Sequence, residues 1–109
     1  MILSGLRAAL LAAALVAPGS LQAQSDAACA RDVLVAGSMQ RQAVEQLEAG
    51  GDDDASRCRV WRRHVETMRR IAGVYGRCLS GPERTERLGQ VQTSEKDFSG
   101  LLRTRCRGM

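Results

Sequence analysis

Four cysteines, Cys29, Cys58, Cys78 and Cys106, are the residues of this chain best suited to chemistry, and no two of them are close in sequence. Structural zinc sites take paired cysteines a few residues apart, thioredoxin-type redox sites use Cys-x-x-Cys, and covalent haem uses Cys-x-x-Cys-His. None of these spacings occurs, so we expect no metal and no cofactor. Four widely spaced cysteines in a short exported chain instead indicate two disulfides.

The only histidine, His64, is a weak candidate for a catalytic base. It follows Arg63, and Glu66 is two residues away and therefore not on the same helical face. A general base needs an orienting carboxylate, which this neighbourhood does not supply. We therefore expect a partly exposed surface histidine. The sequence also has no convincing nucleophile–base pair or phosphate-binding loop, so we expect no enzyme.

The acidic triplet Asp52-Asp53-Asp54 offers carboxylates that could bind calcium. It lacks the D-x-D-x-D-G spacing of a calcium-binding loop, however, and it precedes a helical pattern. Acidic residues at a helix start cap free N–H groups and favour the positive end of the helix dipole. We interpret the triplet as a helix start.

Arginine dominates the basic residues, with 15 Arg and one Lys in 109 residues and a formal net charge of +4. Six arginines follow the expected middle helix: Arg59, Arg62, Arg63, Arg69, Arg70 and Arg77. Such a strip suits an anionic envelope surface or an acidic protein partner. The alternative is a solvated face, neutralised by Glu66 and by acids of neighbouring helices. We expect no nucleic-acid partner, because the chain is predicted to be exported and its few aromatic residues lie on apolar stripes.

The first 23 residues have the pattern of a secretory signal peptide. A short basic start ends at Arg7, an apolar run covers Ala8–Ala17, and Pro18 precedes a small residue, Ala23, at the expected cut. An apolar run of this length falls short of the roughly 20 residues that cross a membrane. We expect residues 1–23 to be removed and residues 24–109 to form one domain of net charge +3, located in the periplasm or secreted.

Apolar residues in the remaining chain recur at steps of three and four, which is typical of helices. The clearest stripe comprises Cys58, Trp61, Val65, Met68, Ala72, Tyr75 and Leu79. It predicts one helix that starts near Asp52–Asp54 and ends before Gly81-Pro82, with Trp61 and Tyr75 in the core. A first helix is expected from about Asp26 to about Ala49, with the stripe Cys29, Val33, Ala36, Gln40, Val44 and Leu47.

The third helix is expected from Pro82 to about Arg105, with the stripe Leu88, Val91, Phe98, Leu102 and Cys106. Glu95 occupies the missing step of this stripe. Ser94 followed by Asp97 resembles a capping box. The helix therefore either runs through or breaks near Thr93, and the sequence leaves both alternatives open.

Short connections make the three helices antiparallel neighbours, which defines an all-α three-helix bundle. Cys29 and Cys78 then lie at one end of the bundle, and Cys58 and Cys106 lie at the other. Twenty helical residues span about 30 Å, which excludes a Cys58–Cys78 bond. The other alternative pairings join opposite ends. Only Cys29–Cys78 with Cys58–Cys106 remains.

The layout C-x2-W-x2-H…Y-x2-C-x-x-G…F…C, from Cys58 to Cys106, resembles small exported four-cysteine helical proteins of proteobacteria that have no assigned activity. A fainter likeness is to periplasmic, disulfide-tied, lysozyme-inhibitor-like helical domains, although the terminal segment Leu101–Cys106 departs from them. From this resemblance and from the residues described above, we expect the chain to be an exported, non-enzymatic interaction module with an unknown protein partner. The alternatives are a peripheral binder of anionic envelope surfaces through the arginine strip and a lysozyme-inhibitor-like protein.

Overall fold

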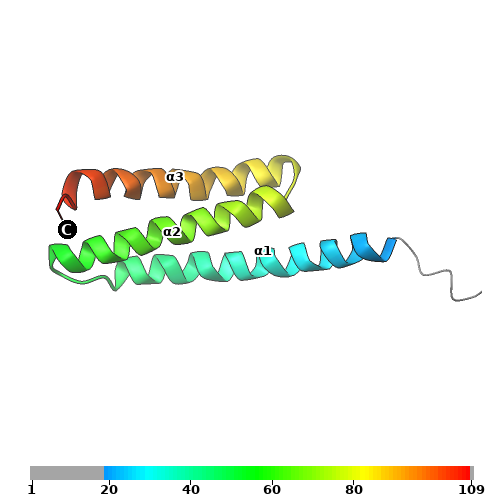
Figure 1. Ribbon diagram of the computed structural model, residues 1–109, viewed down its shortest axis with the longest axis horizontal. Coiled ribbons are helices and arrows are strands. Elements are labelled where there is room, and N and C mark those ends of the chain that lie inside the picture. Colours follow the sequence, from blue (N-terminus) through cyan, green and yellow to red (C-terminus); the bar gives the residue numbers. More distant parts are fainter. Residues whose placement is uncertain (1–18, 109) are drawn as a thin grey trace, which may run out of the picture.

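The computed structural model describes residues 19–108, which form three helices: α1 (Gly19–Glu48), α2 (Asp54–Cys78) and α3 (Gly81–Arg105). Neighbouring helices run antiparallel, and α2 lies between α1 and α3 (Figure 1). No strand occurs in this part of the chain. The expected all-α three-helix bundle is confirmed.

The acidic triplet lies at the start of α2, where its negative charge favours the positive end of the helix dipole. Asp53 is the N-cap residue in an extended conformation, and Asp54 lies in the first turn. The Asp53 side chain does not bond a free backbone N–H at this end. The Ser56 side chain is the main cause of the lowered pKa of Asp53. At the other end of α2, Arg77 lies in the last turn, so charges of opposite sign complement both ends of the helix dipole.

A tight turn joins α2 to α3. Leu79 and Ser80 are extended, and Gly81 has φ +62°, a left-handed conformation that residues with a Cβ rarely adopt. Pro82 follows as an early residue of α3, where its missing N–H is not needed. This turn reverses the chain within a few residues and sets α3 antiparallel to α2.

The third helix is continuous through Thr93. The Ser94 hydroxyl lies 2.8 Å from His64 Nε2 on α2 and is therefore engaged between helices. Glu95, the polar residue in the apolar stripe, accepts a 2.7 Å hydrogen bond from Arg69 Nε. Two of the three residues that favoured a break, Ser94 and Glu95, are explained by contacts of α3 with α2.

The N-terminal boundary differs from the expected one, because α1 begins at Gly19 and not near Asp26. The expected cleavage site after Ala23 falls in the first turns of this helix. Residues 1–18 lie outside the described residues, so the signal peptide, residues 1–23, stays a prediction.

The core is centred on α2, which packs against both other helices. Met68, Ile71 and Tyr75 of α2 meet Ala36 and Ala43 of α1 and Val91 of α3, all of them buried. In the described residues, no Cα atom of α1 lies within 8 Å of a Cα atom of α3. The two outer helices are therefore held together through α2. Tyr75 is buried and Trp61 is half-buried, in agreement with their expected core positions.

Two disulfides tie both ends of this arrangement. Cys29 is bonded to Cys78 with a Cα–Cα distance of 5.2 Å, and Cys58 is bonded to Cys106 with a distance of 5.8 Å. The first joins α1 to α2, and the second joins the start of α2 to the residue that caps α3. The predicted pairing is confirmed. Each bond closes a loop of about 50 residues, worth roughly 4 kcal/mol in the chain-entropy model.

Candidate functional site

The six arginines of the predicted strip on α2 do not share one environment. Three of them bond to nearby side chains: Arg59 to Ser56 Oγ at 3.0 Å, Arg69 to Glu95 at 2.7 Å and Arg77 to Asp32 at 3.2 Å. Of these, Arg69 reaches α3 and Arg77 reaches α1, so two charges are paired with acids of neighbouring helices. Arg62 is half-buried and also makes an interaction.

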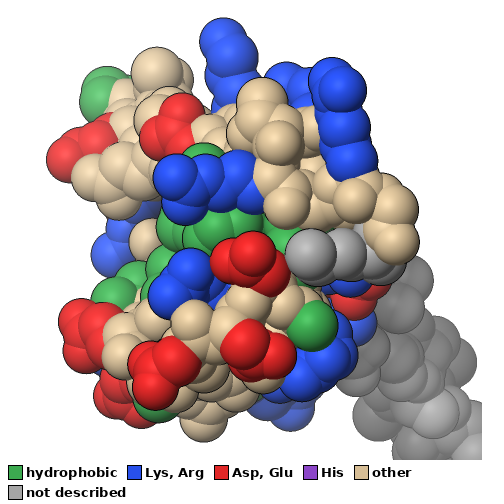
Figure 2. Space-filling model, turned by 90° about the vertical axis from the view of Figure 1, so that its left-hand side faces the viewer, with side chains coloured by type: hydrophobic (Ala, Val, Ile, Leu, Met, Phe, Trp, Pro, Cys, Tyr) green, Lys and Arg blue, Asp and Glu red, His purple; other side chains and the backbone are tan. Residues whose placement is uncertain are grey.

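Arg63 and Arg70 remain exposed and line a shallow depression between α1 and α2. Glu66 stands in the same depression and places a carboxylate beside them. Basic and acidic side chains are also interspersed on the end of the molecule seen in Figure 2. The arginines therefore lie in a mixed-charge surface, which is a weaker attractor of anions than a concentrated basic patch.

The expectation that His64 is a surface residue is wrong. Its side chain is 4% exposed, its Nε2 lies 2.8 Å from Ser94 Oγ, and its ring centroid lies 4.5 Å from that of Phe98. Because α2 is covered by a helix on each side, its buried surface is wider than the single stripe read from the sequence. Ile71 is fully buried outside that stripe for the same reason.

The contact between His64 and Ser94 joins α2 to α3. Burial lowers the pKa of His64, which favours the neutral ring. Its Nδ1 is buried and has no hydrogen-bond partner, so no carboxylate orients the ring as in a catalytic triad. Ser94 lies within a continuous helix, where backbone N–H groups are bonded to carbonyls and cannot stabilise an oxyanion.

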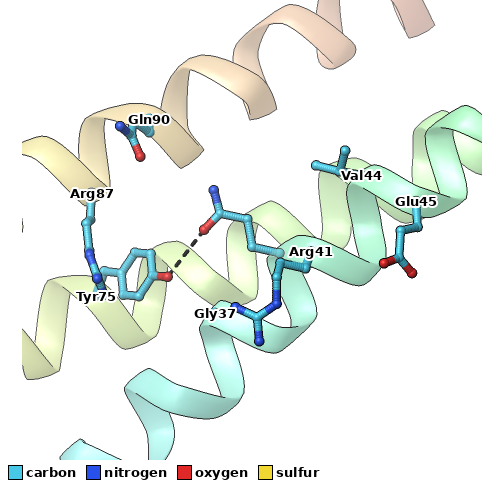
Figure 3. Close-up of a pocket in the computed structure, with 8 residues that line it drawn as sticks. Gly37, Arg41, Val44, Glu45, Tyr75, Arg87 and Gln90 are labelled. Atoms are coloured by element: carbon cyan, nitrogen blue, oxygen red, sulfur yellow. Dashed lines mark hydrogen bonds between the residues drawn. The ribbon is translucent and has the colours of Figure 1, made fainter.

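A hollow lined by side chains of all three helices lies between the outer helices. We call it the α1–α3 groove, and its volume is about 560 Å³. Its lining residues are Gly37, Gln40, Arg41, Val44 and Glu45 of α1, Tyr75 of α2, and Arg87 and Gln90 of α3. In Figure 3 the Arg87 side chain lies beside Tyr75, and the Arg41 and Glu45 side chains point away from α3. The groove exists because α1 and α3 pack against α2 with their backbones apart: no Cα atom of one lies within 8 Å of a Cα atom of the other in the described residues.

Tyr75 forms the floor of the α1–α3 groove and is held from both sides. Its hydroxyl donates a 3.3 Å hydrogen bond to Gln40 Oε1, drawn as the dashed line in Figure 3. The guanidinium of Arg87 lies over its ring at 5.8 Å from the centroid, within range of a cation–π interaction. These contacts orient Arg87 along the groove.

The chemistry of the groove is that of binding. Arg41 and Glu45 of α1 and Arg87 of α3 bring charges of both signs, and Gln40 and Gln90 bring amides that both donate and accept hydrogen bonds. Val44, which was expected on the apolar stripe of the first helix, is instead 46% exposed and adds an apolar surface here, while the neighbouring Ala43 is buried. A segment with apolar side chains and charges of both signs would match this combination.

Sequence reasoning did not identify this site. Arg41 and Arg87 have no unusual spacing, and only the folded arrangement brings them together. One signal was present: Gln40 interrupts the apolar stripe of the first helix, and a polar residue at a core position needs a partner. That partner is Tyr75, which is 35 residues away in sequence.

Neither a metal site nor a membrane-spanning helix is found among the described residues. No group of three or more His, Cys, Asp or Glu residues among them is arranged to hold a metal ion. None of the helices, over the residues that are described, has the length and apolar character to cross a membrane.

Comparison with known proteins adds no relative: no family model, no curated protein and no solved structure matches this chain. The resemblance to exported four-cysteine helical proteins therefore stays a prediction.

Proposed function

We propose that this protein is an exported, non-enzymatic interaction module that receives a helical segment of a protein partner in the α1–α3 groove. The observation that carries this proposal is the groove itself. Two helices flank it, a third forms its floor, and Arg41 of α1 and Arg87 of α3 are among its lining residues. A helix laid between two others buries its apolar side against both, which is a recurrent mode of peptide recognition.

Export is supported by the two disulfides. Bonds of this kind persist in oxidising compartments such as the periplasm and the extracellular space. The pattern of residues 1–23 points to the same route. Secretion of the full-length chain by an exporting bacterium, followed by intact mass without reduction, tests this part. A chain that starts at Gln24 is expected, and a chain that retains Met1 would contradict it.

The non-enzymatic part is supported by the environment of the only histidine. His64 is packed between helices and its Nε2 is engaged with Ser94, so it is not presented to a substrate. Reproducible turnover of a substrate that is lost in His64→Ala would overturn this part of the proposal.

The groove is favoured over the arginine strip as the contact surface. Arg69 and Arg77 of the strip are paired with acids, and so is Arg87 of the groove, with Glu83 at 3.7 Å. The groove is favoured because its charged side chains line one hollow together with the exposed Val44. A partner segment that carries carboxylates gains from both guanidinium groups. Binding to anionic vesicles that survives Arg41→Glu and Arg87→Glu but is lost in Arg63→Glu would reverse this preference.

Site-specific photo-crosslinking in exporting cells tests the groove. A photoreactive residue at Gln90, which lines the groove, is compared with one at Thr93, which is exposed on α3 and is not among the lining residues. We expect a discrete adduct from position 90, little from position 93, and a weaker adduct when Arg87→Glu is added. Equal adducts at both positions, or none at position 90, would refute the groove as the contact surface.

A further inference from the structure

The first helix carries a second stripe of residues that its own fold does not bury. Its members follow steps of 4, 3, 4, 3 and 4: Ala30, Leu34, Gly37, Arg41, Val44 and Glu48. Leu34 is 76% exposed and Val44 is 46% exposed, the first and third most exposed large hydrophobic residues described. We call this set the α1 stripe. Three of its six members, Ala30, Leu34 and Val44, are apolar, and the seven-residue spacing sets all six on one side of α1, where a second helix would contact them together.

The α1 stripe faces the hollows that flank α1. Gly37, Arg41 and Val44 line the α1–α3 groove. Ala30 and Leu34 line a second hollow of about 490 Å³ beside the Cys29–Cys78 disulfide. A helix placed along this stripe would therefore lie over the groove, where the proposed function requires a partner segment.

The stripe is complementary to itself when two copies run antiparallel. Its spacing is symmetric about position 39, so Leu34 faces Val44 of a second copy and Gly37 faces Arg41. In the Ala30–Glu48 and Leu34–Val44 layers a larger side chain meets a smaller one. In the Gly37–Arg41 layer a Cβ at Gly37 would lie 3.7 Å from Arg41 Nη1 of its own chain, so the Arg41 side chains of the two copies lie side by side there. Parallel pairing would instead set Arg41 against Arg41 and Glu48 against Glu48, and like charges disfavour it.

The charges that flank the stripe favour the same arrangement. Arg31 and Glu45 each follow a stripe residue and lie on one side of it, near opposite ends. Neither forms an ion pair within the part of the chain that the structure describes. Antiparallel pairing brings Arg31 of each copy beside Glu45 of the other, which makes two opposite-charge contacts related by the two-fold axis.

We infer that the helical segment received by the groove is α1 of a second copy of this chain, so that the protein forms an antiparallel dimer through the α1 stripe. This inference rests on the proposed function and names its partner. One helix pair buries less than a standard protein interface, so the dimer is expected to be weak and reversible.

Sedimentation of the secreted, oxidised chain from about 1 μM to about 1 mM tests the dimer. We expect the average mass to rise with concentration toward twice that of the monomer. Leu34→Glu should weaken dimerisation by about 100-fold or more, because two buried leucines are replaced by charges. Val35→Glu is the matched control: Val35 is 52% exposed, adjacent in sequence and outside the stripe, so this variant should dimerise like the wild type.

Charge exchange tests the orientation. Arg31→Glu and Glu45→Arg should each weaken the dimer, and the double variant should restore it, because each copy then supplies the reversed partner. All of these positions are exposed, so folding is retained. Equal weakening by Leu34→Glu and Val35→Glu would overturn the inference, as would a chain that stays monomeric throughout.

The two proposals fail in different ways. A monomeric chain whose position 90 still crosslinks to another protein would refute the second copy and retain the groove. An adduct of twice the chain mass, lost in Leu34→Glu and kept in Val35→Glu, would support both. A monomeric chain with no adduct at position 90 would refute both.

Discussion

The buried histidine gives the molecule a pH dependence with a defined sign. His64 is 4% exposed, its Nδ1 has no partner, and burial lowers its pKa below the ordinary value of 6.5. The unfolded chain therefore binds the proton more tightly than the folded chain does. The free energy of unfolding should be highest above pH 6.5, fall as the pH drops below 6.5, and level off below the pKa of the folded state.

The number of protons that bind limits how steeply the free energy of unfolding can change with pH. His64 is the only histidine, so at most one proton is taken up in this range, and the slope cannot exceed about 1.4 kcal/mol per pH unit. The groups that face the ring from α3 are the Ser94 hydroxyl and the Phe98 ring, and neither titrates in this range.

Guanidinium unfolding followed by far-UV circular dichroism, from about pH 7.5 to about pH 5, measures this effect while most carboxylates stay ionised. His64→Leu removes the titrating ring and the unpartnered Nδ1, so its stability should change little over the same range. Ser94→Ala is the matched control. It should lower stability by about 1–3 kcal/mol, since Nε2 loses its partner, while it keeps the pH dependence.

A wild-type stability that is constant between these pH values, or that rises as the pH falls, would refute this reasoning. Either result would mean that the protonated ring is accommodated in the folded state. A pH dependence that persists unchanged in His64→Leu would assign the effect to another group.

Three further changes have defined outcomes in the same unfolding assay. Alanine at both Cys58 and Cys106 should lower the free energy of unfolding by about 4 kcal/mol, because the bond closes a separation of 48 residues, and an unchanged midpoint would contradict its role. Tyr75→Phe removes one 3.3 Å hydrogen bond at the groove floor and should cost about 1 kcal/mol; a loss several times larger would show that this bond organises more of the groove. Arg69→Ala breaks an exposed ion pair and should change stability by less than about 1 kcal/mol, so a larger loss would contradict the assignment of this pair to the solvated surface.

The helices and their cross-links followed from short-range patterns. The stripe from Cys58 to Leu79 predicted α2, and the Gly81-Pro82 pair predicted its end, because helix periodicity and backbone restrictions act over a few residues. The disulfide pairing followed from helix length alone, since a rigid helix keeps Cys58 and Cys78 at opposite ends. These are properties of single elements or of their order in the chain.

The environment of individual side chains depended on which faces the neighbouring helices cover. A single buried stripe on α2 predicts that His64 lies at the surface. In the structure His64 is buried, because α1 and α3 cover two sides of α2. The same packing keeps α3 continuous, since Ser94 and Glu95 find partners on α2 that no local pattern specifies.

The amino-acid sequence by itself determined the number of helices, their antiparallel order and the cysteine pairing, because periodicity, turn residues and helix length fix these locally. Only the tertiary structure decided that α1 and α3 stay apart, that Tyr75 and Arg87 meet between them, and that the α1 stripe is left uncovered. These features arise from the angle at which two helices pack around a third, and that angle depends on the combined side-chain volumes of all three.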